Sequence, residues 1–239
     1  MKSTDSKAFL VRKMTRQDLN QVALMQVGMI PGSTVDKVLL SLTNELTHES
    51  YLYLVICKRI TTKNDADESR AHNLFRIFVN ILEPRVAESF IRKSLREVLT
   101  FFVKKHASGE ILGFAGLWFG YNEVHINSIY VKDSNRRTGL GELLQIAAMQ
   151  VAINSGSDRL TLEVRTSNLI AQALYRKYGC IEEGIRHKYY RDNNENALIM
   201  TNASIQSSEY EDIFRSCIRQ YELRWEGHLG GKVISLLNI

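Results

Sequence analysis

Hydrophobic and polar positions in the middle of the chain predict a strand followed by a helix. Residues 124–131 alternate with the period of two that is typical of a strand lying largely inside the molecule. Residues 140–151 carry leucine, alanine and valine at i, i+3, i+4 and i+7, which is one apolar face of a helix, and Gly156 marks its expected end. The six residues 136–141 join the two patterns.

Similar patterns cover the N-terminal part of the chain. They predict a strand over residues 9–14, a helix that opens with Thr15 and Asp18 as a capping pair, a break at residues 30–32, an amphipathic helix over residues 35–46 and a strand over residues 51–60. Residues 61–72 are polar enough for a loop, residues 73–82 are apolar but of ambiguous type, and residues 86–97 predict a helix. Residues 99–105 and 111–119 flank Ala107-Ser108-Gly109-Glu110 as the arms of a hairpin.

Beyond the central helix, the pattern predicts a strand, a helix, a strand pair and a helical tail. These are a strand over residues 160–165, a helix capped by Ser167 or Asn168 that ends at Tyr178 and Gly179, and strands over residues 181–187 and 197–200. In the tail, Ser208 and Glu211 form a candidate capping box. The tail helix has one apolar face, which favours packing on the parent domain over binding to a partner protein. That face consists of Tyr210, Ile213, Phe214, Cys217, Ile218, Tyr221 and Trp225.

Composition places the chain among ordinary globular proteins. Its 239 residues suffice for one large domain or one domain with appendages, and 44% hydrophobic with 24% charged residues is a common balance. The net charge of +5 suits an anionic ligand but is too mild to indicate direct nucleic-acid binding. Three cysteines without a C-x-x-C pair indicate a reducing compartment, and no apolar run is long enough for a signal peptide or a membrane span. We therefore expect a cytoplasmic protein with no membrane partner.

The segment Arg136, Arg137, Thr138, Gly139, Leu140 and Gly141 is a candidate phosphate-binding loop. A glycine-rich turn at a helix N-terminus presents backbone N–H groups to an anion, and glycine lets the anion approach the backbone. The spacing is neither that of a P-loop nor that of a dinucleotide-binding loop. Taken alone, the segment fits an ordinary strand-to-helix turn equally well.

With its flanking motifs, the loop resembles the R/Q-x-x-G-x-G/A loop that holds the coenzyme A pyrophosphate in GNAT-superfamily acetyltransferases. The resemblance is closest to the RimI-type ribosomal-protein alanine N-acetyltransferases. It covers residues 109–200 strongly and residues 9–53 weakly. The matching motifs are Phe114-Ala115-Gly116-Leu117-Trp118, Glu123-Val124-His125-Ile126, Leu162-Glu163-Val164-Arg165-Thr166-Ser167-Asn168, Ala173-Leu174-Tyr175, Tyr189-Tyr190 and Asn196-Ala197-Leu198-Ile199-Met200.

The resemblance implies an α/β (α+β) GNAT fold with a mixed central sheet and flanking helices. The acetyltransferase domain would span residues 1–200, with a helical insertion at about 60–98, and residues 201–239 would form a C-terminal helical extension. The implied reaction is direct acetyl transfer from acetyl-CoA, without a metal, to the α-amino group of a protein or peptide N-terminus. A ribosomal protein is one candidate acceptor.

The resemblance also implies the site residues. Glu163 would be the general base and Tyr175 the general acid, and burial of Glu163 on its strand is expected to raise the pKa of its carboxylate. Tyr175 and Asn168 lie seven residues apart, on one helix face, where both would contact the coenzyme. The strand residues Ile129, Tyr130 and Val131 would pair with the pantetheine arm, and the 136–141 loop would hold the phosphates. Ion pairing for Glu163 and core packing for Tyr175 are the structural alternatives.

Three functions of different classes remain open at this point. Besides an N-terminal acetyltransferase, the chain suits an acetyltransferase for a small amine or an inactive coenzyme-binding interaction module. Retention of Glu163 and Tyr175 argues against the inactive module, and Tyr189-Tyr190 favours a peptide acceptor. His125 is a weaker candidate for proton relay, because a lone strand histidine is more often a packed residue.

Overall fold

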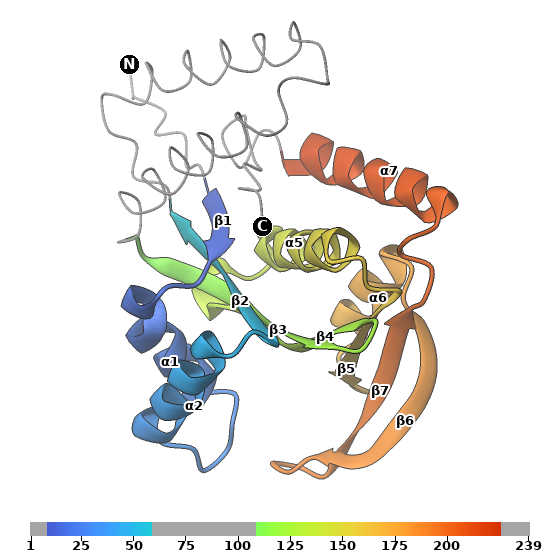
Figure 1. Cartoon of the computed structure of the whole chain (residues 1–239). Helices are drawn as coiled ribbons and strands as arrows, with labels where there is room; N and C mark the ends of the chain where they lie inside the picture. The colour runs from blue at the N-terminus through green and yellow to red at the C-terminus, as the bar shows by residue number, and fades with distance from the viewer. Residues whose placement is uncertain (1–8, 59–108, 226–239) are drawn as a thin grey trace, which may run out of the picture. The chain divides into compact units, whose positions relative to one another are not determined.

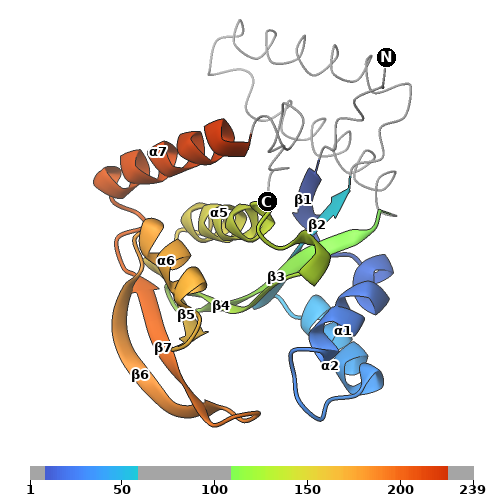
Figure 2. The same ribbon diagram turned by 180° about the vertical axis from the view of Figure 1, so that it is seen from behind.

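The computed structural model describes residues 9–58 and 109–225 (Figures 1 and 2). The chain divides into two compact units, Met1–Lys58 with Glu110–Ile239, and Arg59–Gly109. Apart from Gly109, the described residues belong to the first unit. The expected loop at 61–72, helix at 86–97, hairpin arm at 99–105 and insertion at about 60–98 lie outside the described residues, as do residues 226–239.

A mixed sheet of seven strands forms the centre of the described unit, as expected for this fold class. The strand order across the sheet is β1-β2-β3-β4-β5-β7-β6. The strands are β1 (Phe9–Lys13), β2 (Tyr51–Lys58), β3 (Ile111–Gly120), β4 (Glu123–Val131), β5 (Arg159–Arg165), β6 (Ile181–Tyr190) and β7 (Glu195–Asn202). Neighbouring strands in the sheet run antiparallel except β4 and β5, which are parallel.

Helices cover both faces of this sheet (Figures 1 and 2). They are α1 (Leu19–Val27), α2 (Val35–Thr47), α5 (Leu140–Asn154), α6 (Leu169–Lys177) and α7 (Ser208–Trp225), with short 3-10 turns at Arg16–Asp18 and Asp133–Asn135. Alternate residues of β2 enter two separate cores, since Leu54 and Ile56 pack with α5 whereas Tyr53 and Val55 pack with α1 and α2. The helix and strand patterns therefore gave the correct element types throughout the described residues.

The capping pair predicted at Thr15 and Asp18 is confirmed. The Asp18 carboxylate accepts hydrogen bonds from the backbone N–H and the hydroxyl of Thr15, at 2.8 and 2.9 Å. The same carboxylate forms a buried bidentate ion pair with Arg12, at 2.6 and 2.8 Å. Burial raises the pKa of Asp18, but the hydrogen bonds from Arg12 and Thr15 outweigh it and leave the pKa lowered. This pair joins β1 to the start of α1.

The tail helix α7 packs on the rest of the unit, which was the favoured interpretation. Tyr210, Phe214, Cys217 and Tyr221 are buried in the same core as α5, and the Tyr210 hydroxyl donates to the Tyr178 carbonyl at 2.9 Å. The predicted capping box of Ser208 and Glu211 is wrong. The hydroxyl of Ser207 accepts from the N–H of Tyr210 at 3.1 Å, while the Glu211 carboxylate pairs with Arg215.

Candidate active site

The parallel strands β4 and β5 separate along their length, and this split organises the candidate site. Parallel pairing joins Glu123–Ile126 to residues 159–162 only. Beyond it, β4 continues to Val131 paired with β3, and β5 continues to Arg165 paired with β7. A bulge in β4 at Asn127, where the β3–β4 register shifts, marks the point of separation. Ligands of open sheets commonly bind where strands part at their carboxyl ends.

The β4 edge that faces the split offers backbone hydrogen-bonding groups. Lys132 donates its N–H to the Leu112 carbonyl of β3 at 2.9 Å. Because backbone groups of a strand point alternately to its two sides, Tyr130 faces β3 as well, while Ile129 and Val131 face β5. The Ile129 backbone and the Val131 N–H therefore face an extended ligand, while the Val131 carbonyl accepts from Nε of Arg136 at 3.4 Å and Tyr130 contributes no backbone group on that side.

The 136–141 loop lies at the far end of the split, where α5 begins. Arg137 and Gly139 have left-handed backbones, with φ of 61° and 82°, and Gly139 is the N-cap. The first intrahelical bond runs from the N–H of Leu143 to the Gly139 carbonyl, so the N–H groups of Leu140 and Gly141 precede the helix ladder. Those donors and the helix dipole suit a phosphate.

The two loop glycines have different surroundings. A Cβ on Gly141 would have Val131 as its nearest neighbour, at 3.9 Å, so the space above this residue is open. A Cβ on Gly139 would lie 2.5 Å from the indole of Trp225, at the end of α7. Gly139 is thus required by its backbone and by Trp225, a contact that the sequence did not predict. Only Gly141 is free of structural demands from the chain itself.

Glu163 lies on β5 beside the split and contacts two basic side chains. Its side chain is 6% exposed; one oxygen lies 2.7 Å from Nε2 of His125 on β4, and the other lies 2.9 Å from a guanidinium nitrogen of Arg186 on β6. Tyr189 and Tyr190 are also close enough to feel the Glu163 charge. The contact with Arg186 was missed at the sequence level, because no local pattern relates the register of β6 to β5.

The expectation that Glu163 has a raised pKa is wrong. Burial does raise the pKa, but the hydrogen bond and charge of His125, together with the charge of Arg186, outweigh burial and leave the pKa of Glu163 below its usual value. The carboxylate is therefore ionised at neutral pH and able to accept a proton. The lowered pKa also makes it a weaker base than burial alone would produce.

Tyr175 packs on the other side of β5. It is 9% exposed and belongs to the core that contains Leu162 and Val164, whereas Glu163 points to the opposite face of the strand. Burial raises the pKa of Tyr175, with smaller contributions from Cys180 and Tyr190, so its hydroxyl keeps its proton at neutral pH. Tyr178, at the end of α6, is fully buried.

Asn168 begins α6 and is its N-cap. Its side-chain oxygen accepts the N–H of Ala171 at 3.2 Å, which leaves the amide NH₂ as the group free to meet a coenzyme. The alternative cap, Ser167, instead donates its backbone N–H to the Glu195 carboxylate at 2.8 Å. Lys177 and Tyr178 of the following turns contact Glu142 of α5, at 2.5 and 3.0 Å, and so fix α6 against the helix of the loop.

Comparison with known proteins identifies this arrangement. A putative ribosomal protein bS18-alanine N-acetyltransferase of Bacillus subtilis (strain 168) is 37% identical over 117 residues, which are 49% of this chain and 78% of that protein. The model of the acetyltransferase (GNAT) family matches residues 68–180. The chain belongs to the GNAT acetyltransferase family. Acetyl-CoA is the co-substrate of this family, and the open space at Gly141 with the N–H groups of the α5 turn fits its pyrophosphate.

Solved GNAT structures share the fold at lower identity. The ribosomal-protein-S18-alanine N-acetyltransferase from Escherichia coli is 22% identical with a TM-score of 0.51, covering 82% of this chain and 94% of that one. A spermidine N-acetyltransferase from Vibrio cholerae is 14% identical with a TM-score of 0.56, covering 84% and 95%. At such low identity the comparison shows the fold alone. Enzymes named for a ribosomal protein and for spermidine share this fold.

Between residues 9 and 58 and between 109 and 225, the helices are too short or too polar to cross a membrane. Within the same ranges, His, Cys, Asp and Glu side chains do not gather in threes around a possible metal position.

The contact between His125 and Glu163 leads to a prediction about pH dependence. In His125→Gln, burial would act on Glu163 with less opposition, so its pKa would rise and the ionised fraction at a given pH would fall. The acidic limb of the kcat/KM profile is expected to move to higher pH while the limb itself is retained. Steady-state kinetics across pH measure this, with His48→Gln as a control. Loss of the acidic limb in His125→Gln would instead identify His125 as the titrating base.

Proposed function

We propose that this GNAT enzyme transfers the acetyl group of acetyl-CoA directly to the α-amine of a protein or peptide N-terminus. The observation that carries the proposal is the position of Glu163, an ionised and nearly buried carboxylate beside the β4–β5 split whose far end is the 136–141 loop. The Bacillus relative, named for an N-terminal alanine acceptor, supports this acceptor class.

In the proposed mechanism, acetyl-CoA supplies a thioester carbonyl that the acceptor nitrogen attacks. The loop N–H groups with Arg136 and Arg137 hold the phosphates, and the backbone edge of Ile129 and Val131 that faces the split pairs with the pantetheine arm. The amide of Asn168 meets the same arm from the start of α6. These contacts orient the thioester in the split, which lowers the entropic part of the barrier.

Two side chains move protons in this mechanism. Glu163 accepts the proton that the α-ammonium must lose before its nitrogen can attack, directly or with His125 as its hydrogen-bonded partner. Tyr175, on the other side of β5, donates its hydroxyl proton to the departing sulfur; burial raises the pKa of this hydroxyl and so keeps it protonated until that step. As the C–N bond forms and the C–S bond breaks, the nitrogen loses its second proton, which returns to the Tyr175 oxygen, and Glu163 releases the first proton to solvent. The products are the acetylated amine, the thiol of coenzyme A and one proton.

A comparison of three acceptors tests the proposed substrate class. A tetrapeptide with a free N-terminal alanine is expected to exceed both its N-blocked lysine analogue and spermidine in kcat/KM by tenfold or more. The α-amine has a pKa of about 8 against ~10.4 for the lysine side chain, so its deprotonation costs roughly 3–4 kcal/mol less at the same pH. The weak base described above makes this difference important. A tenfold advantage for spermidine would replace the proposal by a small-amine acetyltransferase.

A further inference from the structure

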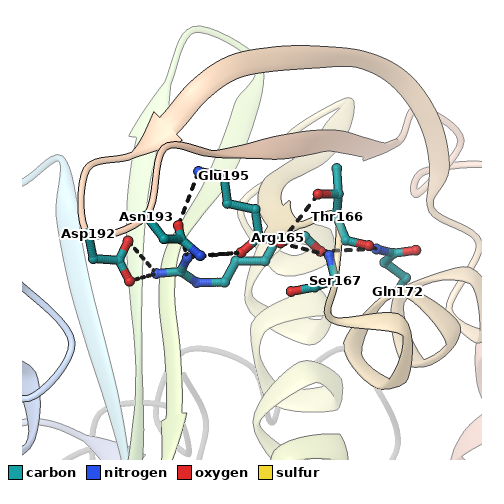
Figure 3. Close-up of polar contacts among 7 residues, drawn as sticks. All are labelled: Arg165, Thr166, Ser167, Gln172, Asp192, Asn193 and Glu195. Atoms are coloured by element: carbon teal, nitrogen blue, oxygen red, sulfur yellow. Dashed lines mark hydrogen bonds and ion pairs between the residues drawn. The ribbon is translucent and has the colours of Figure 1, made fainter.

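Arg165, the last residue of β5, makes the densest set of polar contacts near the split. It lies two residues beyond Glu163 and so faces the same side of the sheet. Its guanidinium donates to both carboxylate oxygens of Asp192 at 3.0 and 2.8 Å, to Asn193 at 3.1 Å and to Glu195 at 3.1 Å. Figure 3 shows these acceptors gathered around the guanidinium from the β6–β7 turn.

The same guanidinium stacks on Tyr190, with its carbon 3.8 Å from the ring centroid. Tyr190 packs edge-on against Tyr189 at 5.1 Å, and Arg186 lies over Tyr189 while pairing with Glu163. Contacts thus run without interruption from Arg165 through both tyrosines to Glu163.

The β6–β7 ladder is interrupted just before this pair and resumes at Tyr190, which faces Glu195. The β6–β7 register shifts between Arg186 and Tyr190, and Lys188 within this interval has a left-handed φ of 52°. Lys188 bonds through its N–H to the Asn196 side chain at 2.9 Å instead of to a facing backbone carbonyl. Because the ladder is interrupted between Arg186 and Tyr190, side-chain contacts hold Tyr189 and add to the single strand pairing of Tyr190.

Hydrogen bonds from α6 hold the backbone at Arg165. Gln172 of α6 donates to the carbonyls of Arg165 and Thr166, both at 3.0 Å (Figure 3). Glu195 accepts from Ser167 and Thr166 as well as from Arg165. The hydrogen bonds from Ser167 first, and then those from Arg165 and Asn193, lower the pKa of Glu195 to about 2. The end of β5, the start of α6 and the β6–β7 turn therefore form one connected unit.

We propose that Arg165 is a positioning residue that sets acceptor affinity by holding the β6–β7 turn and the Tyr189-Tyr190 pair beside Glu163. The inference rests on the proposed function, because it takes the tyrosines as one wall of the acceptor site. The planar guanidinium is essential, since it binds Asp192 in bidentate fashion and stacks on Tyr190 at the same time. The ammonium of a lysine offers no such planar fork.

The kinetic test compares Arg165→Gln with Arg159→Gln, which removes the same charge from the exposed start of β5. In Arg165→Gln, the KM for the alanine peptide is expected to rise tenfold or more, while the Kd for acetyl-CoA from calorimetric titration changes less than twofold. The KM of Arg165→Lys is expected to lie closer, on a logarithmic scale, to that of Arg165→Gln than to that of the unmodified protein. Asp192→Asn should raise KM in the same direction, and the double variant should be no worse than Arg165→Gln alone, because both changes break one interaction.

Hydrogen exchange separates this inference from the proposed function. Backbone amides of residues 187–194 are expected to exchange faster in Arg165→Gln than in Arg159→Gln or the unmodified protein, whichever amine the enzyme acetylates. If the unmodified enzyme prefers spermidine, the proposed acceptor is wrong, and the KM comparison is made with spermidine. Unchanged exchange across 187–194, or an acceptor KM that moves less than twofold in a folded Arg165→Gln, would overturn the positioning role. An equal loss of acetyl-CoA affinity would overturn it too, because the residue would then act through Asn168 and α6.

Discussion

Replacing Glu163 by glutamine is expected to lower turnover at neutral pH by ~10²–10⁴-fold, with acetyl-CoA affinity retained. Glutamine has nearly the same shape as glutamate and can keep a hydrogen bond to His125, but it cannot take a proton from the acceptor. Since the side chain is 6% exposed, solvent has little direct access to replace it. The coenzyme contacts proposed along β4 and the loop do not include this carboxylate.

Steady-state kinetics with the alanine peptide and calorimetric titration with acetyl-CoA measure the two halves of this result. Glu183→Gln is the matched control, because Glu183 is an exposed carboxylate on β6, which is separated from β5 by β7. Part of the lost turnover should return at high pH, where the α-amine sheds its proton without help. A fall in turnover of less than threefold would show that another group, or solvent, acts as the base.

The sequence predicted the order and type of the described elements because their patterns are local. The alternation in β5, the apolar face of α5 and the capping residues Thr15, Asp18 and Asn168 depend on neighbours within a few positions. The wrong capping box in the tail also has a local cause. Ser207 and Ser208 are adjacent and chemically alike, so the pattern placed the cap one residue late.

The electrostatics of Glu163 could not be predicted in the same way. Burial on a strand was visible in the pattern Leu162-Glu163-Val164, but the sign of the pKa shift depends on His125 and Arg186, which are 38 and 23 positions away in the chain and arrive through β4 and β6. Strand order and register decide these contacts, and neither is written in local periodicity. Arg165 is similar, because its acceptors Asp192 and Asn193 lie in the β6–β7 turn and its acceptor Glu195 begins β7, 27 to 30 positions further along the chain.

The 136–141 loop shows both what local patterns predict and what long-range contacts add. Its position before α5 was predicted correctly, and the left-handed φ of Gly139 agrees with the choice of glycine there. No local pattern indicated that Trp225, 86 positions later, would lie against Gly139. Two glycines that looked equivalent as phosphate contacts therefore have separate roles, and an experiment on the loop must treat them separately.

Gly141→Val is expected to weaken acetyl-CoA binding by on the order of 10²-fold or more while the protein stays folded. The space above Gly141 is open in the protein itself, with Val131 as the nearest neighbour at 3.9 Å, so the valine side chain obstructs the phosphates and little else. Losing two charge-assisted hydrogen bonds of about 1.5–3 kcal/mol each accounts for a change of that size. Calorimetric titration with acetyl-CoA measures the affinity, and thermal unfolding verifies the fold.

Gly139→Val and Gly184→Ala are the controls for the effect of Gly141→Val on coenzyme affinity. At Gly139, a side chain meets both an unfavourable φ of 82° and the indole of Trp225, so this variant is expected to lose thermal stability in the absence of any coenzyme. At Gly184 on β6, an added Cβ would meet Ile199 at an ordinary 3.6 Å, and coenzyme affinity should be unchanged. If Gly141→Val binds acetyl-CoA as tightly as the unmodified protein, the 136–141 loop is not the phosphate site, whatever Gly139→Val does. If affinity falls only in Gly139→Val and in step with its stability, the loop matters for seating α7, and the phosphates must bind elsewhere along the split.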